Sequence, residues 1–427
     1  MSEFLAPINY DRSRDVLRQL HFYTRYTPDG AQRALEVLSQ RYPTVFERME
    51  KKTFVNGAVL LEMTGGSATG PLVFVSHLDA PMDEDAADCV HELPMSVAVS
   101  RAHLVALLEA LEALLNEGYC PGGDLMLALS MDGLSGGAGA AAMAAHLKAR
   151  SVVPCFVLDY GGYVTMDAFR TYLPKGAPLA LVGITEKGEL HGELTADEAV
   201  CARKGCAHLR PVDELLRAGR RLVRRPWHAA LCNASEQMLV ALGKKAPFLQ
   251  RQLVSHPRRT FPLIKFLWRR RAIMRQFFFS ERTVYGLSAK GTPQDPARAA
   301  TLRFTQTLIP GQKTADYHHH LRDLAKNPDL KLSFPVENDS GVRSEASGEA
   351  WDALCTAVEI QFDRVVIVPC LSPYPTDARF YSQLEGGRVY RFSPFMVTGD
   401  EALSAMCTVT DGALQTAVQF FRSMLSV

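Results

Sequence analysis

The residues best suited to chemistry follow a hydrophobic run in PLVFVSHLDAPMDEDAAD (71–88). The run ends at His77 and Asp79, a His-x-Asp pair at the mouth of a predicted buried strand. A histidine at this point is suited to binding a metal ion, and a carboxylate two residues on is suited to orienting its ring. Alternatively, the two side chains have a purely structural role and only hydrogen-bond to each other at the end of a strand. Both interpretations stay open on these residues alone.

Two further acids occupy similar places. Asp159 in VLDYGG (157–162) ends another apolar run, and the two glycines after it allow close approach of the backbone to a ligand. It is either a metal ligand or an aspartate that starts a turn. Asp132 in MDGLSGGAGA (131–140) stands ahead of a glycine-rich helix start. It is either a general base or the N-cap of that helix.

Apolar runs that alternate with helical patterns indicate the fold that positions these residues. Buried strands are predicted at 57–63, 72–77, 124–131, 152–160 and 363–371, and helices at 100–118 and 137–150. Such alternation is typical of a doubly wound, mostly parallel sheet that is covered on both faces. In these sheets, chemistry gathers beyond the carboxyl ends of the strands. We therefore group His77, Asp132 and Asp159, because each lies at or just after such an end.

A length of 427 residues exceeds what one compact core usually holds and predicts two domains. The middle of the chain carries a strand, a Pro-Gly turn, a helix and another strand, which suggests a smaller unit inserted into the larger one. We predict an α/β fold in which residues 1–182 and 336–427 form the main domain. Residues 183–335 form the inserted, smaller α+β domain.

Composition narrows the function classes. The net charge of +1 gives no global attraction to nucleic acid or to a membrane. The nine cysteines include no CxxC pair, which argues against a disulfide framework or a cysteine-rich zinc site. Residues 1–20 are charged where a signal peptide needs an apolar core, and no apolar run reaches membrane-spanning length. A cytoplasmic protein is the expectation.

These segments resemble, in order, those of the zinc carboxypeptidase and aminoacylase family of di-metal peptidases, in particular its N-acyl-amino-acid hydrolase and vacuolar carboxypeptidase branch. FVSHLDAP resembles the family's strand ending in Gly-His-x-Asp, and VLDYGGYV its Leu-Asp-Glu-Gly-Gly segment. MDGLSGGAGA lies where the family has Asp-Glu-Glu followed by glycines. PYPTDARFYSQLEGGRVYRFSPF is similar to its Gly-Gly-Thr-Asp-Ser-Arg stretch and the Tyr-Arg-Phe-Ser-Pro that follows. The resemblance implies a metallopeptidase-like main domain with an inserted lid and dimerisation domain.

Carried over residue by residue, the resemblance implies a partial metal site. His77 and Asp159 fall on ligands of one metal ion, and Asp79 falls on the carboxylate that orients the histidine. The family's catalytic glutamate and the ligand glutamate beside it fall on Asp132 and Gly133. Glycine has no side chain with which to bind a metal. Asp132 is one methylene shorter than the glutamate it replaces.

Three further family positions also change in this comparison. The bridging aspartate falls on Val99 or Ser100, and the last histidine ligand falls near Leu403, because the C-terminal segment contains no histidine. The histidine of the family's lid domain aligns with Ala207, or with His208 if the alignment is shifted by one residue. A second zinc ion would then keep essentially no protein ligand. The first would keep two, short of the three that catalytic zinc sites use.

Two functions follow from the resemblance, and the sequence leaves open whether the chain is an enzyme. The favoured one is a catalytically impaired or non-catalytic homologue, a pseudoenzyme, that binds a peptide, an acyl-amino-acid-like ligand or a partner in the old cleft. The alternative is an active metal-dependent hydrolase of peptide or N-acyl-amino-acid amide bonds, with a rearranged site completed by the acidic loop 83–88. We expect at most one zinc ion, and none under the favoured function. The candidate site residues are His77 and Asp159 for the metal and Asp132 and Asp79 for catalysis.

A basic and aromatic segment, HPRRTFPLIKFLWRRRAIMRQFFF (256–279), stands within the inserted region. It suits a helix at a membrane surface or on nucleic acid, or one that packs in the lid or against a second copy. The resemblance places an apolar lid insertion here and favours packing. The expected partners are therefore a small peptide-like molecule and a second copy bound through the lid, with neither nucleic acid nor membrane.

Overall fold

A large mixed sheet organises the main body of the protein. The structure is a computed structural model that describes residues 8–22, 28–67, 70–79, 95–198, 210–224, 228–292, 297–403 and 409–426. These residues form a nine-stranded sheet in the order β1-β2-β4-β3-β5-β15-β7-β14, with β6 paired to β7. The strands are β1 (Glu50–Thr53), β2 (Val59–Met63), β3 (Leu72–His77), β4 (Leu125–Ser130), β5 (Phe156–Asp159), β6 (Tyr163–Thr165), β7 (Leu179–Glu186), β14 (Val366–Ser372) and β15 (Val389–Arg391).

The direction of the strands confirms the predicted fold class. The central strands β4, β3, β5 and β15 run parallel, as do β7 and β14, whereas β1, β2 and β6 run antiparallel to their neighbours. Strands β4, β3 and β5 are adjacent, so their carboxyl ends meet at one edge. That edge carries His77 and Asp159, each the last residue of its strand, and Asp132 follows two residues after β4.

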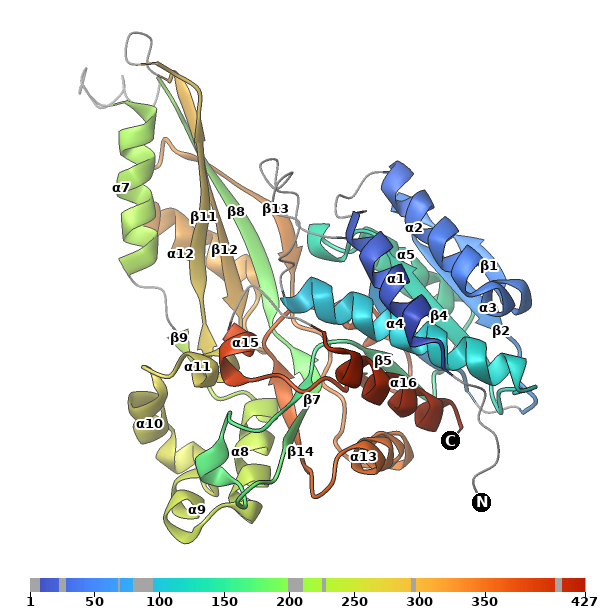
Figure 1. The fold of residues 1–427 in the computed structure, drawn as a ribbon. Helices are drawn as coiled ribbons and strands as arrows, with labels where there is room; N and C mark the ends of the chain where they lie inside the picture. The colour runs from blue at the N-terminus through green and yellow to red at the C-terminus, as the bar shows by residue number, and fades with distance from the viewer. Residues whose placement is uncertain are drawn as a thin grey trace.

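Helices cover both faces of this sheet, as its apolar strands require (Figure 1). One face packs against α4 (Met95–Asn116) and α16 (Asp411–Leu425), and the other against α5 (Ala138–Ala149) and α14 (Ala378–Tyr381). Helix α4 is apolar on nearly every side because it lies between the sheet and a second layer of helices. The remaining helices of this body are α1 (Tyr10–Phe22), α2 (Pro28–Arg41), α3 (Pro43–Arg48), α13 (Glu349–Gln361) and α15 (Gly399–Leu403).

A second, four-stranded antiparallel sheet extends away from the large one (Figure 1). Its order is β11-β12-β8-β13, and α7 (Pro211–Arg224) and α12 (Thr314–Ala325) cover one face with a hydrophobic cluster of their own. The strands are β8 (Gly188–Asp197), β11 (Arg282–Ala289), β12 (Ala299–Leu308) and β13 (Lys331–Asn338). These elements lie in the inserted region, although the exact domain boundaries stay a prediction.

Another part of the inserted region returns to the large sheet. Helices α8 (Asn233–Lys245), α9 (Phe248–Val254), α10 (Pro257–Trp268) and α11 (Ala272–Phe278) lie beside β14 and β7 (Figure 1). The short strands β9 (His228–Ala229) and β10 (Phe279–Ser280) bracket them. Their buried side chains, such as Leu239 and Trp268, share one cluster with the core of the large sheet. None of the helices that the structure describes is long and apolar enough to span a bilayer.

Candidate functional site

His77 is held on both ring nitrogens at the end of β3. Its Nδ1 lies 2.7 Å from Asp79 Oδ1, and its Nε2 lies 3.0 Å from the hydroxyl oxygen of Tyr160. In the neutral imidazole, Nδ1–H donates to Asp79 and Nε2 accepts from the Tyr160 O–H. Both rings are buried, with 2% of His77 and 3% of Tyr160 exposed. The nitrogen that faces away from Asp79 is therefore occupied by a phenol.

Asp79 is fixed by the backbone as well as by His77. The N–H of Gly133 donates to Oδ1 at 3.1 Å, and the N–H of Leu134 donates to Oδ2 at 2.8 Å. Burial raises the pKa of Asp79, but the charge of His77 and these hydrogen bonds outweigh burial and lower it. Burial likewise lowers the pKa of His77, and the Asp79 carboxylate outweighs it, so that the pKa of His77 is raised. Asp79 orients the His77 ring, as its position in the sequence suggested.

Asp159 is buried at the end of β5 and has both oxygens engaged. Oδ1 accepts from the Tyr160 N–H at 2.8 Å, and Oδ2 accepts from the Ala378 N–H at 2.9 Å, which ties β5 to α14. Asp377 lies close by and accepts a hydrogen bond from the Ser130 hydroxyl. Burial, reinforced by the charge of Asp377, raises the pKa of Asp159 to about 8. Burial thus favours the neutral form of Asp159 in this arrangement.

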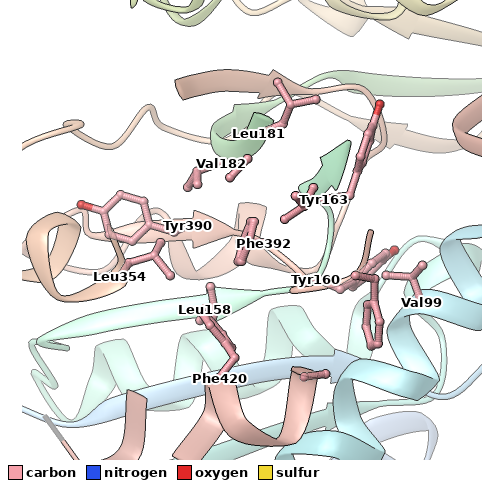
Figure 2. Packing of buried hydrophobic residues seen from close by; sticks show 14 of the residues in the cluster. Val99, Leu158, Tyr160, Tyr163, Leu181, Val182, Leu354, Tyr390, Phe392 and Phe420 are labelled. Atoms are coloured by element: carbon pink, nitrogen blue, oxygen red, sulfur yellow. The ribbon is translucent and has the colours of Figure 1, made fainter. Parts of the chain in front are cut away.

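Position 133 has no room for any side chain. A Cβ atom on Gly133 would lie 2.9 Å from His77 Cγ and 3.2 Å from Asp377 Oδ2. Val99 of α4 is 3% exposed and belongs to the same buried cluster as Tyr160 (Figure 2). The space around the His77 ring is therefore closed by backbone on one side and bordered by apolar packing.

Asp132 acts at the start of α5. The N–H of Gly139 donates to its Oδ1 at 3.2 Å and its Oδ2 at 3.0 Å, and the Asn56 amide donates to Oδ2 at 2.8 Å. The N-cap residue of α5 is Gly137 and not Asp132, but the Asp132 carboxylate satisfies an N–H in the first turn of the helix from the preceding loop. Among the described residues, no hydrogen bond joins Asp132 to His77 or Asp159.

Arg101 adds a buried cation next to this group. Its guanidinium donates to the carbonyl of Leu78 at 3.2 Å, and only 2% of the residue is exposed. Burial lowers the pKa of Arg101 to about 10, against the favourable charge of Asp79. Its Nε and Nη1 have no hydrogen-bond partner among the described residues. A buried guanidinium with two unmet donors is suited to an anionic group.

Comparisons with known proteins find similar sequences and a shared fold among hydrolases and peptidases. The chain is 27% identical over 308 residues to the human N-fatty-acyl-amino acid synthase/hydrolase PM20D1, covering 70% of this chain and 59% of the relative. It is 21% identical over 388 residues to a probable carboxypeptidase S-like 2 of Dictyostelium discoideum, covering 86% of this chain and 73% of the relative. Among solved structures, human carnosine dipeptidase 1 matches with a TM-score of 0.68 at 12% identity, over 98% of this chain and 97% of that one. The dipeptidase Dug1p of Saccharomyces cerevisiae matches with a TM-score of 0.67 at 11% identity, over 100% of both chains.

The chain is similar in sequence to members of the zinc carboxypeptidase and aminoacylase family and shares the fold of its solved structures. No family model matches the chain. The aligned part spans less than two thirds of the human relative, and the synthase/hydrolase activity in its name is that of the relative. The family is typically metal-dependent, which makes the fit of a metal to these side chains the next question.

The described residues do not fit the two-zinc centre of this family. No three of their His, Cys, Asp and Glu side chains come together in a way that could hold a metal ion. The two predicted ligands His77 and Asp159 are close enough to influence each other's pKa, but each is engaged by protein groups. Several predicted contributors lie outside the described residues, namely Asp83, Glu84, Asp85, Asp88, His91, Ala207 and His208.

Three residues of the site were not singled out from the sequence. Tyr160 could have been found from the sequence, because it stands where the family's Leu-Asp-Glu-Gly-Gly segment has glutamate. Asp377 also lay within a matched segment, in PYPTDAR. Nothing in the sequence points to Arg101, because a cation in the helical pattern of 100–118 is expected to face solvent. Only the tertiary structure places it beside Asp79.

Proposed function

We propose that the chain is a family member without the two-metal reaction, and that it uses the old cleft to bind a peptide, an acyl-amino-acid-like ligand or a protein partner. The observation that supports this most directly is the 3.0 Å hydrogen bond between the Tyr160 hydroxyl and His77 Nε2. A zinc ion needs the lone pair of that nitrogen, and catalytic zinc sites take three protein ligands. A metal would have to displace a buried phenol and find ligands beyond His77 and Asp159.

Metal analysis of the purified protein tests the loss of the metal site. After incubation with zinc and removal of the excess, we expect well under one zinc ion per chain, with no change in His77→Ala. His319→Ala serves as the control, because the side chain of His319 is 86% exposed and can bind zinc adventitiously. Stoichiometric zinc that disappears in His77→Ala, together with hydrolysis of N-acyl amino acids, would contradict the proposal. That result would favour the alternative of a rearranged one-metal hydrolase.

Arg101 supports a ligand with a carboxylate group. Its Nε and Nη1 have no partner within the described part of the chain, and leaving such donors unpaired in a buried place costs about 1–3 kcal/mol or more. A carboxylate satisfies a guanidinium with two parallel hydrogen bonds. Peptides and acyl-amino acids both end in a carboxylate, so this cation provides a chemical reason for their binding.

Calorimetric titration with N-acetylmethionine and with its amide tests this role of Arg101. Because hydrogen bonds to charged groups are worth roughly 1.5–3 kcal/mol, the acid should bind about 10- to 100-fold more tightly than the amide. Arg101→Gln should abolish this preference, whereas Arg48→Gln, an exposed arginine on α3, should retain it. Equal binding of acid and amide to the unaltered protein would remove the basis for the proposed ligand class.

We also propose a homodimer formed through the four-stranded sheet. Strand β11 is an edge strand, and its Tyr285 and Leu287 are 55% and 43% exposed. An edge strand with exposed apolar side chains is a ready surface for pairing with a second copy. Light scattering should report a dimer that Tyr285→Asp weakens, and a monomer would refute this proposal. The cytoplasmic location expected from the sequence stays a prediction.

A further inference from the structure

The charge of the chain is concentrated in one segment. Residues 237–280 contain ten Lys or Arg and no Asp or Glu, while the whole chain has a net charge of +1. The rest of the protein therefore carries a net charge of −9. This segment forms most of α8 and all of α9, α10 and α11 at one end of the molecule (Figure 1). An electropositive end on an otherwise acidic protein predicts an anionic partner.

Helix α10 has apolar side chains on two sides, one of which is buried against the core while the other is exposed. Ile264 and Trp268 point into the core and are 1% and 2% exposed. On the opposite side, Leu263, Phe266 and Leu267 are 52%, 59% and 47% exposed. The spacing of the outer residues places them together on one helical face. The outer side of α10 therefore exposes three large apolar side chains next to Lys265, and a contiguous exposed apolar patch of this kind indicates an interaction site.

Helix α9 adds to this exposed apolar surface. Its Phe248 and Leu249 are 72% and 78% exposed, and α9 packs against α10. At α10 itself, a cavity of about 560 Å³ is lined by Pro262, Lys265, Phe266, Arg269, Arg270 and Phe279. Half of these lining residues are cations, and the other half are apolar. The surface thus offers apolar side chains and positive charge within the same few turns of helix.

Three cations on and just after α10 form no ion pair with the described residues. Lys265, Arg269 and Arg270 are exposed, and no described carboxylate lies within ion-pair distance of them. Arg269 instead lies over the ring of Phe266, with 4.5 Å between Cζ and the ring centroid. These charges therefore remain available to a partner.

We infer that the outer face of α9 and α10 is a docking surface for an anionic lipid bilayer. The exposed leucines and phenylalanines enter the boundary between headgroups and acyl chains, and Lys265, Arg269 and Arg270 contact anionic headgroups. This docking lies in the plane of the membrane and requires no spanning helix. It goes beyond the sequence-based preference for packing alone, because packing accounts only for the Ile264 and Trp268 face.

Two other classes of partner fit this surface less well. Nucleic acid would engage the cations, but Leu249, Leu263 and Leu267 have no counterpart on a phosphate backbone, and the face of Phe266 is already covered by Arg269. An apolar protein surface would bury the leucines, but it would leave the exposed cations desolvated without partners. A bilayer with anionic headgroups satisfies both groups of side chains at once.

Sedimentation with phosphatidylcholine vesicles, with and without phosphatidylserine, tests this inference on the full chain. The charge variant carries Lys265→Gln, Arg269→Gln and Arg270→Gln. The apolar variant carries Leu263→Ser, Phe266→Ser and Leu267→Ser. A matched control neutralises three exposed cations on α2, α3 and α5, far from this surface in Figure 1, namely Arg33→Gln, Arg48→Gln and Lys148→Gln. All replaced side chains are exposed, so each variant should melt at the temperature of the unaltered protein.

The unaltered protein and the control should bind vesicles that contain phosphatidylserine far more tightly than vesicles without it. Each membrane-facing cation contributes about a fivefold gain in affinity, so the charge variant should lose on the order of a hundredfold. The apolar variant should lose binding as well. The inference is overturned if the unaltered protein ignores anionic vesicles, or if the charge variant binds like the control. It is also overturned if this surface instead binds a DNA duplex, or if the apolar variant converts a dimer into a monomer in light scattering, because the surface would then lie between two copies.

Discussion

Replacing Gly133 with alanine tests whether the position of the family's ligand glutamate has been closed to side chains. The added Cβ would lie 2.9 Å from His77 Cγ and 3.0 Å from His77 Cβ, closer than unstrained atoms come. His77 cannot easily move aside, because Asp79, Tyr160 and the hydroxyl of Ser100 all hold it. The strain must therefore appear as lost stability or as a broken hydrogen bond.

The size of the effect follows from the cost of inserting one methyl group into a filled interior. Overpacking of this kind costs about 1–3 kcal/mol. Exchanging glycine for alanine also stabilises a protein by roughly 0.4–1 kcal/mol, because it restricts the unfolded chain. Gly122→Ala isolates this second effect, because no atom lies within 4 Å of the Cβ that it would add. The free energy of unfolding of the two variants should differ by about 1–3 kcal/mol, with Gly133→Ala the less stable.

Urea unfolding followed by fluorescence measures this difference. Gly133→Glu adds a second arm, since it restores the side chain that the family resemblance places here. We expect that variant to be still less stable and to bind no more zinc than the unaltered protein. The steric argument fails if Gly133→Ala and Gly122→Ala are equally stable. It fails also if Gly133→Glu folds normally and acquires stoichiometric zinc, because position 133 would then have room for a ligand.

Three further substitutions test the hydrogen bonds of the site and the charge of the core. Tyr160→Phe should lower the free energy of unfolding by about 1–3 kcal/mol, because it leaves His77 Nε2 buried and unpaired. Tyr163→Phe is the control and should cost little, because it removes a buried hydroxyl that has no partner among the described residues. Urea unfolding of both variants measures the difference, and equal stabilities would contradict the role of the Tyr160 hydroxyl. Asp132→Ala should destabilise α5 by about 1–2 kcal/mol without changing zinc content, and an unchanged melting temperature would contradict its role at the start of α5. Burial lowers the pKa of His103 to about 3, against roughly 6.5 in the unfolded chain, so the unfolded chain binds the extra proton between these pH values and stability falls as the pH falls. From pH 7 to pH 5 the unaltered protein should lose about 2 kcal/mol that His103→Leu does not lose, and parallel pH profiles would contradict this.

The strands of the large sheet could be predicted because their signal is local. The predicted segments 72–77 and 124–131 correspond to β3 and β4, each of which is an apolar run that ends in a polar residue. Adjacent parallel strands bring their carboxyl ends together, so the position of His77 and Asp159 at two strand ends was enough to predict that they lie close to each other. The family followed from the order of such segments along the chain.

The contents of the site could not be predicted in the same way, because they depend on contacts between strands. Tyr160 continues an apolar run in the sequence, and nothing local shows that its hydroxyl reaches a histidine 83 residues away. Arg101 likewise looks like a solvated residue until α4 is placed behind β3. The two apolar faces of α10 are indistinguishable in the sequence, since the difference between Ile264 and Leu263 is only which one meets the core.

The three aspartates of the site make hydrogen bonds that stabilise the fold, and these are sufficient to explain their presence. Asp79 accepts from two backbone N–H groups, Asp159 joins β5 to α14, and Asp132 accepts from the first turn of α5. Removing any of these carboxylates would leave buried donors unpaired, which costs about 1–3 kcal/mol for each group. Their presence therefore fits a protein with no metal reaction as well as one that has it. The discriminating positions are Gly133, which offers no side chain to a metal, and Tyr160, whose hydroxyl occupies the His77 nitrogen that a metal would need.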